Sequence, residues 1–501
     1  MPHFLAIDQS TSATKALLFN ERLELLDREG IEHVQHYPRA GWVEHDAEEI
    51  WQNLLTVARR LLGRRPAEAE SLCSLSITNQ RETIVVFEKS SGKPLYPALV
   101  WQCRRGVGLC DAANAGGLGQ LVEERTGLKI DAYFSASKLK WLMQNEPEIA
   151  RKVRSGEALV GTIDAYLIYR LTEGRTFATD TTNASRTLLY DIALLRWDEA
   201  LCELWDTPLH ALPEVRDCEA KFGETTLGGI LKEALPICGV MGDSQAALFA
   251  QGCYEPGSAK VTFGTGSSIL LNVGSEMKRS DNGVVTTLAW TRGGIPTYAM
   301  EGIIISSAAT LAWLKNQLGL FESYSEVEPM ARELTGNGGV YLVPAFTGLG
   351  LPYWKADARA TIVGLSSQSD RRHLVRAGIE SMAYQVSEAL AAMREDAGVS
   401  LSGLKADGGA TKNSFLMQLV ADLCRVDLSV AGMPECSPLG ATMAGMLGMG
   451  LVVSPEDFSL GSAEGFTPRM LAEESDRLLG EWRSAVQQTL APLEAKDPLY
   501  L

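Results

Sequence analysis

The sequence predicts an α/β protein made of two similar domains that face each other across a central cleft. Residues 4–19 and 259–273 share one pattern: an apolar run, a tight turn rich in Ser, Thr or Gly, and a second apolar run. The pattern predicts two β-hairpins whose turns carry many N–H and hydroxyl donors, and donors that converge make an anion site. A chain of 501 residues is too long to form a single hydrophobic core, and strand and helix signals alternate along it. We therefore expect two layered domains with a phosphate-binding cleft between them.

After the first hairpin, the sequence predicts a helix and then two strands. Asp46, with Glu49 three residues later, has the pattern of a helix start. Apolar residues then recur on one helical face until Gly63: Ile50, Leu54, Val57 and Leu61. Residues 73–77 alternate with period two and residues 83–87 form an apolar run, so each predicts a strand. A polar turn of residues 78–82 separates the two strands.

The boundary between the two domains is expected near residues 252–258. An apolar strand over residues 237–241 leads into Asp243 and a helix over residues 245–252. The second hairpin follows at once, and Pro256 with Gly257 supplies turn chemistry before it. We therefore expect one domain over residues 1–252 and a second over residues 253–501.

The second domain continues with a strand over residues 404–406, a loop of residues 407–410 and a helix over residues 413–424. The longest apolar stretch, residues 439–453, is too short to span a bilayer and predicts a buried helix. The last ~30 residues predict an amphipathic helix followed by a short tail.

Composition argues against several function classes. The net charge of −16 disfavours nucleic acid or an anionic membrane as the main partner. The nine cysteines are scattered without a Cys-x-x-Cys pair, so we expect free thiols in a reducing compartment rather than a metal cluster or a redox centre. The first ten residues lack a basic segment and contain Asp8, which does not fit a signal peptide. We expect a cytoplasmic protein without membrane insertion.

The first hairpin contains candidate phosphate and metal ligands. Asp8 ends a short apolar strand, where a carboxylate could hold Mg²⁺ beside phosphates. Thr11, Ser12 and Lys15 could donate to phosphate oxygens. The simpler alternative is an Asp that caps an exposed polar turn.

Candidate acceptor residues follow two of the predicted strands. Asp243 lies at the carboxyl end of a strand, where ligands of α/β folds gather, and phosphoryl transfer to an alcohol needs such a carboxylate. Arg81 and Glu82 together offer donors and acceptors to a vicinal diol. Trp101 and Tyr133 could wall a small polar pocket. The simpler alternatives are a helix N-cap, two solvated charges and two core aromatics.

Two glycine-rich turns would let the backbone approach a nucleotide closely. They are residues 264–266 and residues 408–409, and the simpler alternative for each is a plain tight turn. Residues 407–412 have neither the spacing nor the final Gly-Lys-Ser/Thr of a Walker A motif. The sequence also lacks a Rossmann fingerprint and zinc-ligand spacing.

The chain resembles the FGGY carbohydrate kinases, and among them the glycerol kinases, over nearly its whole length. The matching segments are GWVEHD (41–46), ITNQRET (77–83), VWQCRR (100–105), SKLKW (137–141), TNASRT (182–187), VPAFTGLG (343–350) and DGGA (407–410). Because many weak signals fall in one known order, the resemblance outweighs the simpler alternatives for single residues.

The resemblance implies two ribonuclease-H-like, actin-like ATPase domains and an ATP- and Mg²⁺-dependent transfer of phosphate to a small polyol, foremost glycerol to glycerol 3-phosphate. It implies Asp243 as catalytic base and Asp8 as metal ligand. Substrate-binding positions are Arg81, Glu82, Tyr133, Asp243, Ser244, Trp101 and Ser268. ATP-binding positions are Thr11, Ser12, Lys15, Thr265, Ala308, Ala312, Gly409 and Asn413. We also expect a homo-oligomer.

Several positions depart from the glycerol kinase pattern. Ser244 stands for a usual Gln and Ser268 for a usual Phe, which makes the predicted pocket larger and more hydroxylated. On the nucleotide side, Lys15 replaces an Arg, Ala308 a Gly and Ala312 a Gln. The two serines leave open an FGGY kinase for a longer polyol, such as a tetritol or pentitol, or for a ketopentose.

A third hypothesis, from another class, is an actin-like protein that binds nucleotide for assembly or regulation. The presence of Asp8, Arg81, Glu82 and Asp243 argues against it, because a pure binding module needs no acceptor-site carboxylates.

Overall fold

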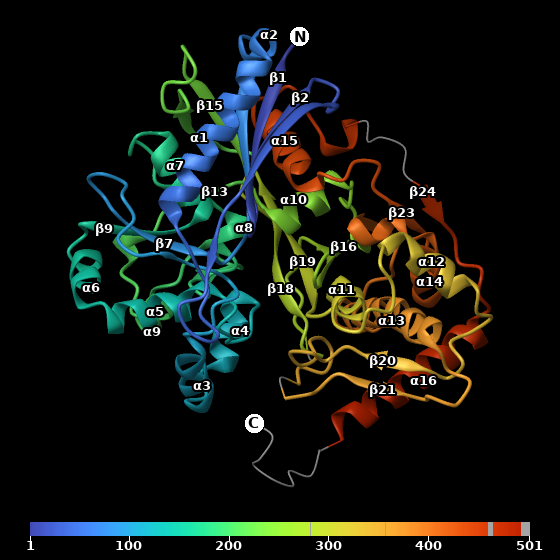
Figure 1. Ribbon diagram of the computed structural model, residues 1–501. Helices are drawn as coiled ribbons and strands as arrows, with labels where there is room; N and C mark the ends of the chain where they lie inside the picture. The colour runs from blue at the N-terminus through green and yellow to red at the C-terminus, as the bar shows by residue number, and fades with distance from the viewer. Residues whose placement is uncertain (281, 356, 459–463, 492–501) are drawn as a thin grey trace.

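Two mixed β-sheets of related topology form the centre of the protein (Figure 1). The computed structural model describes residues 1–280, 282–355, 357–458 and 464–491. In the first sheet, β1 (His3–Gln9) and β2 (Ala13–Asn20) form the predicted first hairpin, and β1 also pairs in parallel with β6 (Leu72–Asn79). The sheet order is β14-β15-β6-β1-β2-β3, with β3 (Leu25–Glu32), β14 (Lys221–Thr225) and β15 (Leu235–Gly242) completing it.

The second sheet repeats this arrangement and adds one strand at an edge. β16 (Ser258–Phe263) and β17 (Ser267–Gly274) form the predicted second hairpin, and β16 pairs in parallel with β22 (Gly403–Gly408). The order is β18-β19-β17-β16-β22-β23-β24, with β18 (Val285–Arg292), β19 (Ile295–Ile304), β23 (Leu428–Val430) and β24 (Glu464–Phe466). In both sheets a central strand has a hairpin on one side and parallel strands on the other, which confirms the predicted α/β fold of two similar halves.

The predicted helix after the first hairpin is α1 (Ala47–Arg64). Asp46 is its N-cap, with Oδ1 accepting from the backbone N–H groups of Glu48 at 2.8 Å and Glu49 at 3.3 Å. The predicted apolar face is buried against β2 and β3. The strands predicted on either side of residues 78–82 belong to different sheets, because β7 (Ile84–Glu88) lies in a five-stranded sheet with β4 (Gln35–His36), β5 (Glu44–His45), β8 (Ala98–Leu99) and β9 (Ala158–Thr162).

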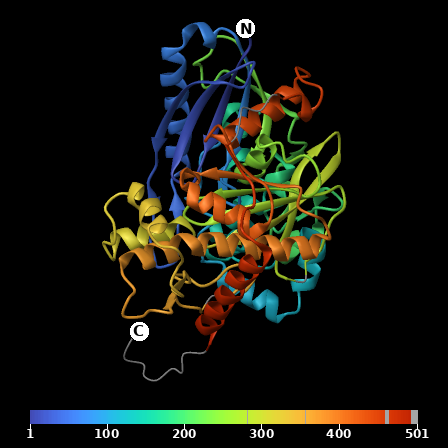
Figure 2. The ribbon, with the colours of Figure 1, turned by 90° about the vertical axis from the view of Figure 1, so that its right-hand side faces the viewer.

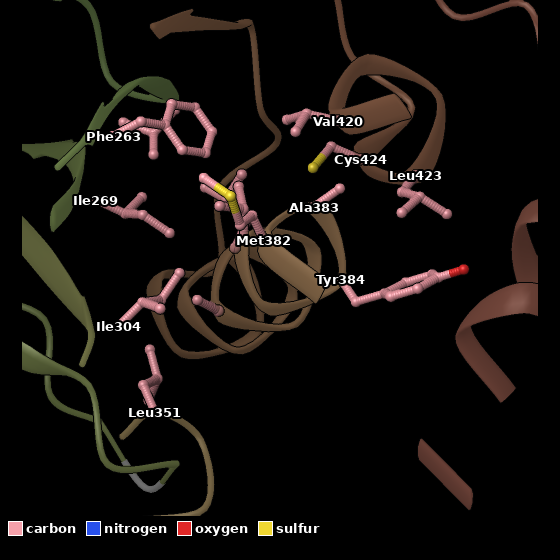
Figure 3. Packing of buried hydrophobic residues seen from close by; sticks show 14 of the residues in the cluster. Phe263, Ile269, Ile304, Leu351, Met382, Ala383, Tyr384, Val420, Leu423 and Cys424 are labelled. Atoms are coloured by element: carbon pink, nitrogen blue, oxygen red, sulfur yellow. The ribbon is translucent and has the colours of Figure 1, made fainter. Parts of the chain in front are cut away.

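The long helix α13 (Arg371–Ala397), orange in Figure 2, packs against β17 and β19 of the second sheet and against α14 (Ser414–Cys424). In Figure 3, Met382 of this helix faces Phe263 of the sheet, and Cys424 of α14 lies on the other side. Tyr384 stacks on Trp482 of α16 (Ala472–Leu490), the predicted amphipathic helix, with ring centroids 5.1 Å apart. The tail predicted after this helix lies mostly outside the described residues.

Two helices lie between the sheets and join the halves of the chain. α10 (Asp243–Ala250) contacts both sheets, and α15 (Cys436–Gly448) packs on β15, β6 and β1 although it follows the second sheet in sequence. α15 also packs closely on α10, and Gly440 permits this contact, because a Cβ there would collide with the carbonyl oxygen of Ala246. α15 is the buried helix predicted from the apolar stretch. Among the residues described, no helix is long and apolar enough to cross a membrane.

Further elements surround these layers. The helices are α2 (Pro66–Ala69), α3 (Val107–Ala115), α4 (Gly119–Thr126), α5 (Ser135–Asn145), α6 (Pro147–Arg154), α7 (Ile163–Leu171), α8 (Thr181–Ala184), α9 (Glu199–Leu204), α11 (Ala308–Asn316) and α12 (Val327–Arg332). The strands are β10 (Ala178–Asp180), β11 (Tyr190–Asp191), β12 (Arg196–Trp197), β13 (Glu214–Arg216), β20 (Tyr341–Val343) and β21 (Thr361–Val363).

A buried carboxyl group at the start of α7 makes the stability of this region depend on pH. Asp164 is fully buried, and Thr179 Oγ1 donates to its Oδ2 at 2.5 Å. Burial, assisted by the nearby Asp180 carboxylate, raises the pKa of Asp164 to about 7. The folded protein therefore holds a proton on this group over a pH range in which an unfolded chain, with an ordinary carboxyl, has lost it.

We expect Asp164→Asn to stabilise the protein more at high pH than at low pH. The stability that protonated Asp164 provides is present below the ordinary carboxyl pKa and is lost as the pH rises towards 7, whereas the asparagine amide does not titrate. The gain in free energy of unfolding should be larger at about pH 8 than at about pH 5 by about 2 kcal/mol. Urea denaturation of both proteins at the two pH values measures it, and equal gains would contradict the expectation.

Candidate active site

Asp243 directly follows the carboxyl end of β15 and lies at the cleft between the two halves of the chain. It is the first residue of α10 and not its N-cap, which is Gly242. Its Oδ1 accepts from the backbone N–H of Ser244 at 2.7 Å and lies 3.2 Å from Nε of Arg81. The side chain is nevertheless 39% exposed. A carboxylate with one oxygen held and solvent access retained can accept a proton from a bound ligand.

Arg81 and Glu82 occupy a tight turn after β6, and both side chains are buried. Glu82 has φ = 63°, a left-handed conformation that is uncommon for a non-glycine residue and is characteristic of functional sites. Its Oε1 accepts from Nε of Arg186 at 2.6 Å. Arg81 Nη2 donates to Oε1 of Glu301 at 2.9 Å. The alternative of two solvated charges is therefore wrong, because Arg81 and Glu82 belong to a buried, paired network.

An aromatic pair connects this turn region to the first hairpin. The rings of Trp101 and Tyr133 lie 5.3 Å apart, and Trp101 Nε1 donates to Thr11 Oγ1 at 3.0 Å. The loop carrying Tyr133 is fixed by Lys138, whose buried Nζ donates to the carbonyl oxygens of residues 132, 133 and 134 at 2.8 Å each. Trp101 and Tyr133 therefore form a rigid apolar wall beside polar groups.

A cavity of about 220 Å³ opens between the two halves of the chain. Its lining comes from both sheets, from α10, and from the start of α15 with the loop before it, and comprises Asp8, Lys15, Asp243, Ser244, Ala247, Thr262, Asp407, Gly408, Pro434, Glu435, Cys436, Ser437 and Pro438. Lys15 Nζ lies 3.3 Å from Oδ2 of Asp8 and 3.2 Å from Oε2 of Glu435. Carboxylates thus outnumber cations around this cavity.

The electrostatics of the cavity favour an additional cation. Burial raises the pKa of Asp8 to about 6, because the opposing effect of Lys15 is offset by Asp243 and Glu435. Burial would lower the pKa of Lys15, but Asp8 and Glu435 outweigh burial and raise it. An ionised Asp8 is therefore costly, and a divalent cation with its phosphate ligands would relieve this cost.

The turn after β22 borders this cavity through Gly408, and the second hairpin turn is held against the start of α11. The carbonyl oxygen of Gly264 accepts from the N–H of Ala308 at 3.1 Å, and that of Thr265 from the N–H of Ser307 at 2.9 Å, which anchors the turn to α11. Gly408 has φ = 97°, and a Cβ there would collide with the carbonyl oxygen of Phe263. The turn of residues 408–409 therefore requires glycine at its first position.

Two separate parts of the chain match one protein family. Residues 3–250 match the N-terminal domain of the FGGY family of carbohydrate kinases, and residues 259–449 match its C-terminal domain. The chain belongs to this family. The resemblance inferred from the motifs is therefore confirmed, and so is the actin-like ATPase fold that it implied.

Full-length relatives of this FGGY chain carry glycerol kinase names. It is 44% identical to "Glycerol kinase 1" of Thermotoga maritima, over 97% of this chain and 99% of that protein, and 42% identical to the glycerol kinase of Aeromonas salmonicida, over 97% of each. The crystal structure of Plasmodium falciparum glycerol kinase with ADP has a TM-score of 0.92 and 35% identity, covering 98% of this chain and 99% of that one. A xylulose kinase from Rhodospirillum rubrum, at TM-score 0.86 and 24% identity over 98% and 99% of the two chains, shares the fold.

In this FGGY structure several of the predicted site residues contact one another. Among the predicted acceptor residues, Asp243 contacts Arg81, Trp101 contacts Tyr133, and Ser244 Oγ lies 3.3 Å from Ser268 Oγ. Among the predicted metal and nucleotide residues, Lys15 contacts Asp8, and Thr265 separately contacts the start of α11.

Four other residues predicted to bind the nucleotide do not line the cavity described above. The side-chain oxygen of Asn413 caps α14 by accepting from the N–H of Leu416 at 2.9 Å. Ala312 lies one turn along α11 from Ala308 and presents only a methyl group. Gly409 begins a 3₁₀ turn directly after Gly408, and Ser12 is exposed in the first hairpin turn.

Three charged residues that form ion pairs with predicted site residues are absent from the sequence-based set. Arg186 contacts Glu82, Glu301 contacts Arg81, and Glu435 contacts Lys15. A signal existed for Glu301, which interrupts an otherwise apolar strand, and for Arg186, which lies within the TNASRT motif. Glu435 lies in the short loop of residues 431–435 before α15, and no pattern in that loop singles it out.

Proposed function

We propose that this chain transfers the γ-phosphoryl group of ATP to a hydroxyl of glycerol and produces glycerol 3-phosphate. The observation that carries the proposal is Asp243, held by Arg81 and facing a cavity that also contains Asp8 and Lys15. Full-length relatives at 42–44% identity that carry glycerol kinase names support the choice of glycerol.

In this mechanism the residues of the chain act mainly by positioning the acceptor. Arg81 and Glu82 hold two neighbouring hydroxyls, and Trp101 and Tyr133 cover the carbon chain. Asp243 accepts the proton of the attacking hydroxyl as the oxygen approaches the γ-phosphorus in line with the leaving group. Closure of the two halves would exclude water, which competes as an acceptor.

The residues on the nucleotide side fit a magnesium–ATP complex. Asp8 is a buried carboxylate with a raised pKa beside Lys15, a donor set suited to Mg²⁺ and phosphate oxygens. Bound Mg²⁺ would neutralise charge on the phosphates. Thr11, Ser12 and Lys15 would donate to phosphate oxygens. The nucleoside would lie against Thr265, Ala308, Ala312, Gly409 and Asn413.

Three further expectations belong to this proposal. The domains extend over residues 1–252 and 253–501, with α15 of the second packed on the sheet of the first. The protein works in the cytoplasm, which the nine cysteines, all free thiols, support. Assembly into a homo-oligomer stays a prediction.

An assay of ADP release across a panel of acceptors tests the proposed reaction. The panel contains Mg·ATP with glycerol, C4 and C5 polyols or ketopentoses. Glycerol is expected to give the highest kcat/KM. If a longer substrate has a kcat/KM at least tenfold higher than glycerol, a difference of about 1.4 kcal/mol in transition-state binding, that substrate and not glycerol is the acceptor. ATP binding without turnover on any acceptor would support the nucleotide-binding hypothesis instead.

A longer polyol or ketopentose is the second candidate acceptor, and one contact favours it. Ser244 Oγ lies 3.3 Å from Ser268 Oγ, and Ser268 Oγ donates to Oε1 of Glu301 at 3.3 Å. Ser268 replaces apolar surface with a hydroxyl, and both hydroxyls can bind an additional substrate hydroxyl. The pair lies between Asp243 and the buried network of Arg81, where a longer carbon chain would extend.

We expect Ser268→Phe to shift preference towards glycerol. The ring would fill the space beside Ser244 and remove a hydroxyl, so the ratio of kcat/KM for glycerol over a C5 polyol should rise about tenfold. Steady-state kinetics on both substrates measures the ratio. Ser268→Ala is the matched control, because it removes the hydroxyl without filling the space. A shift towards the longer substrate in Ser268→Phe would mean that Ser268 does not line the acceptor pocket.

A further inference from the structure

Four buried charged side chains form one network behind the candidate acceptor site. Arg81, Glu82 and Arg186 come from the first half of the chain, and Glu301 comes from β19 of the second sheet. Glu301 Oε1 accepts from Arg81 Nη2 at 2.9 Å, and Oε2 lies 2.6 Å from Arg186 Nη1. One carboxylate of the second half therefore bridges two guanidinium groups of the first half.

This contact fixes the orientation of Arg81. Its Nε lies 3.2 Å from Asp243 Oδ1, its Nη1 donates to Gln245 Oε1 at 3.3 Å, and its Nη2 is held by Glu301. Glu301 is the only one of these three acceptors that is both charged and fully buried, because Gln245 is neutral and the Asp243 side chain is partly exposed. A planar guanidinium held at all three nitrogens has one orientation, so the groups it presents to Asp243 and to a ligand are predetermined.

Glu301 is ionised in this setting. Burial would raise its pKa, but Arg186 and Arg81 outweigh burial and lower the pKa to about 2. Two buried guanidinium groups are thus balanced by two buried carboxylates, those of Glu82 and Glu301. Neutralising Glu301 would leave a buried positive charge without its partner, and Arg81 could then reorient towards another carboxylate.

We propose that Glu301 is a positioning residue for the acceptor site: it holds Arg81 in the orientation that grips the polyol and the Asp243 carboxylate. This inference rests on the proposed phosphorylation of a polyol. Glu301 acts through Arg81: its negative charge, which comes from the second half of the chain, pairs with a guanidinium group of the acceptor site. The acceptor site is therefore complete only when the two halves are assembled as they are here.

The decisive variant is Glu301→Gln, which keeps the size of the side chain and removes its charge. We expect the KM for glycerol to rise about 30-fold, because Arg81 loses its fixed orientation, while the KM for ATP changes less than about threefold. Calorimetric binding of glycerol should weaken by a similar factor. Glu301→Asp keeps the charge on a shorter side chain, and we expect a smaller rise in KM, about fivefold.

A matched control separates positioning from a general loss of stability. Glu380 is another buried glutamate, paired with Arg376 at 2.7 Å within α13. Glu380→Gln should lower Tm without changing the KM for glycerol. An unchanged KM for glycerol in Glu301→Gln, with wild-type enzyme active on glycerol, would overturn the inference. Should that variant fail to fold, an unchanged KM in Glu301→Asp would overturn it equally. Failure of the proposed function would look different, as wild-type protein without acceptor-dependent ADP release.

Discussion

Asp243→Asn is expected to lower kcat for phosphoryl transfer by about 10³-fold, the scale of a lost general base. Asparagine has nearly the same shape, and its side-chain oxygen can still accept from the N–H of Ser244 and from Arg81, which now hold Oδ1 of Asp243. The amide cannot take up the proton of the attacking hydroxyl. The loss should therefore fall on the chemical step and leave the geometry of the site unchanged.

Steady-state ADP release measures the loss of kcat in Asp243→Asn, and calorimetric titration with Mg·ATP measures whether nucleotide binding is retained. The dissociation constant for the nucleotide should change less than about threefold, because the proposed role of Asp243 is towards the acceptor hydroxyl and not towards the nucleotide. Glu435→Gln is the matched control, since it also removes a carboxylate from the cavity lining and should retain at least a tenth of the wild-type kcat. Substantial residual turnover in Asp243→Asn would remove this residue as the base.

The elements that carry the site were predictable because their signals are local. The two hairpins, the Asp46 cap of α1 and the buried strand leading to Asp243 each depend on residues within a few positions of one another. The phosphate-loop and acceptor-turn candidates follow from their places at strand ends. Their assignment to particular roles depended on the resemblance to the FGGY family, because neighbouring residues alone also fit ordinary caps and turns.

The contacts between the halves were not predictable, since they join residues far apart in sequence. Arg81 and Glu301 are separated by 220 positions, and Lys15 and Glu435 by 420. Nothing in the local pattern around α15 indicates that it packs on the first sheet. Likewise, the substitution at Ser268 suggested a larger and more hydroxylated pocket, but not that its hydroxyl donates to a buried carboxylate of the network that holds Arg81.

Asp8→Asn is expected to raise the apparent KM for Mg·ATP by about 10²-fold and to lower kcat as well. The amide oxygen is a weaker ligand for a hard divalent cation than a carboxylate, and it no longer carries the charge that Mg²⁺ would neutralise. Lys15, which now lies 3.3 Å from Asp8, would keep Glu435 as its partner, so its ammonium group stays in place.

Titration of Mg²⁺ at fixed ATP and saturating glycerol measures the expected loss. The midpoint of activation should move to higher Mg²⁺ concentration, while the KM for glycerol stays within about threefold of wild type. Asp8 forms its ion pair with Lys15, and it shares with Asp243 only the lining of the cavity. The variant should also be more stable than wild type without nucleotide, since it no longer buries a carboxylate with a raised pKa. Unchanged Mg²⁺ dependence would show that the metal is held elsewhere, and the gain in stability would then report only the relief of buried charge.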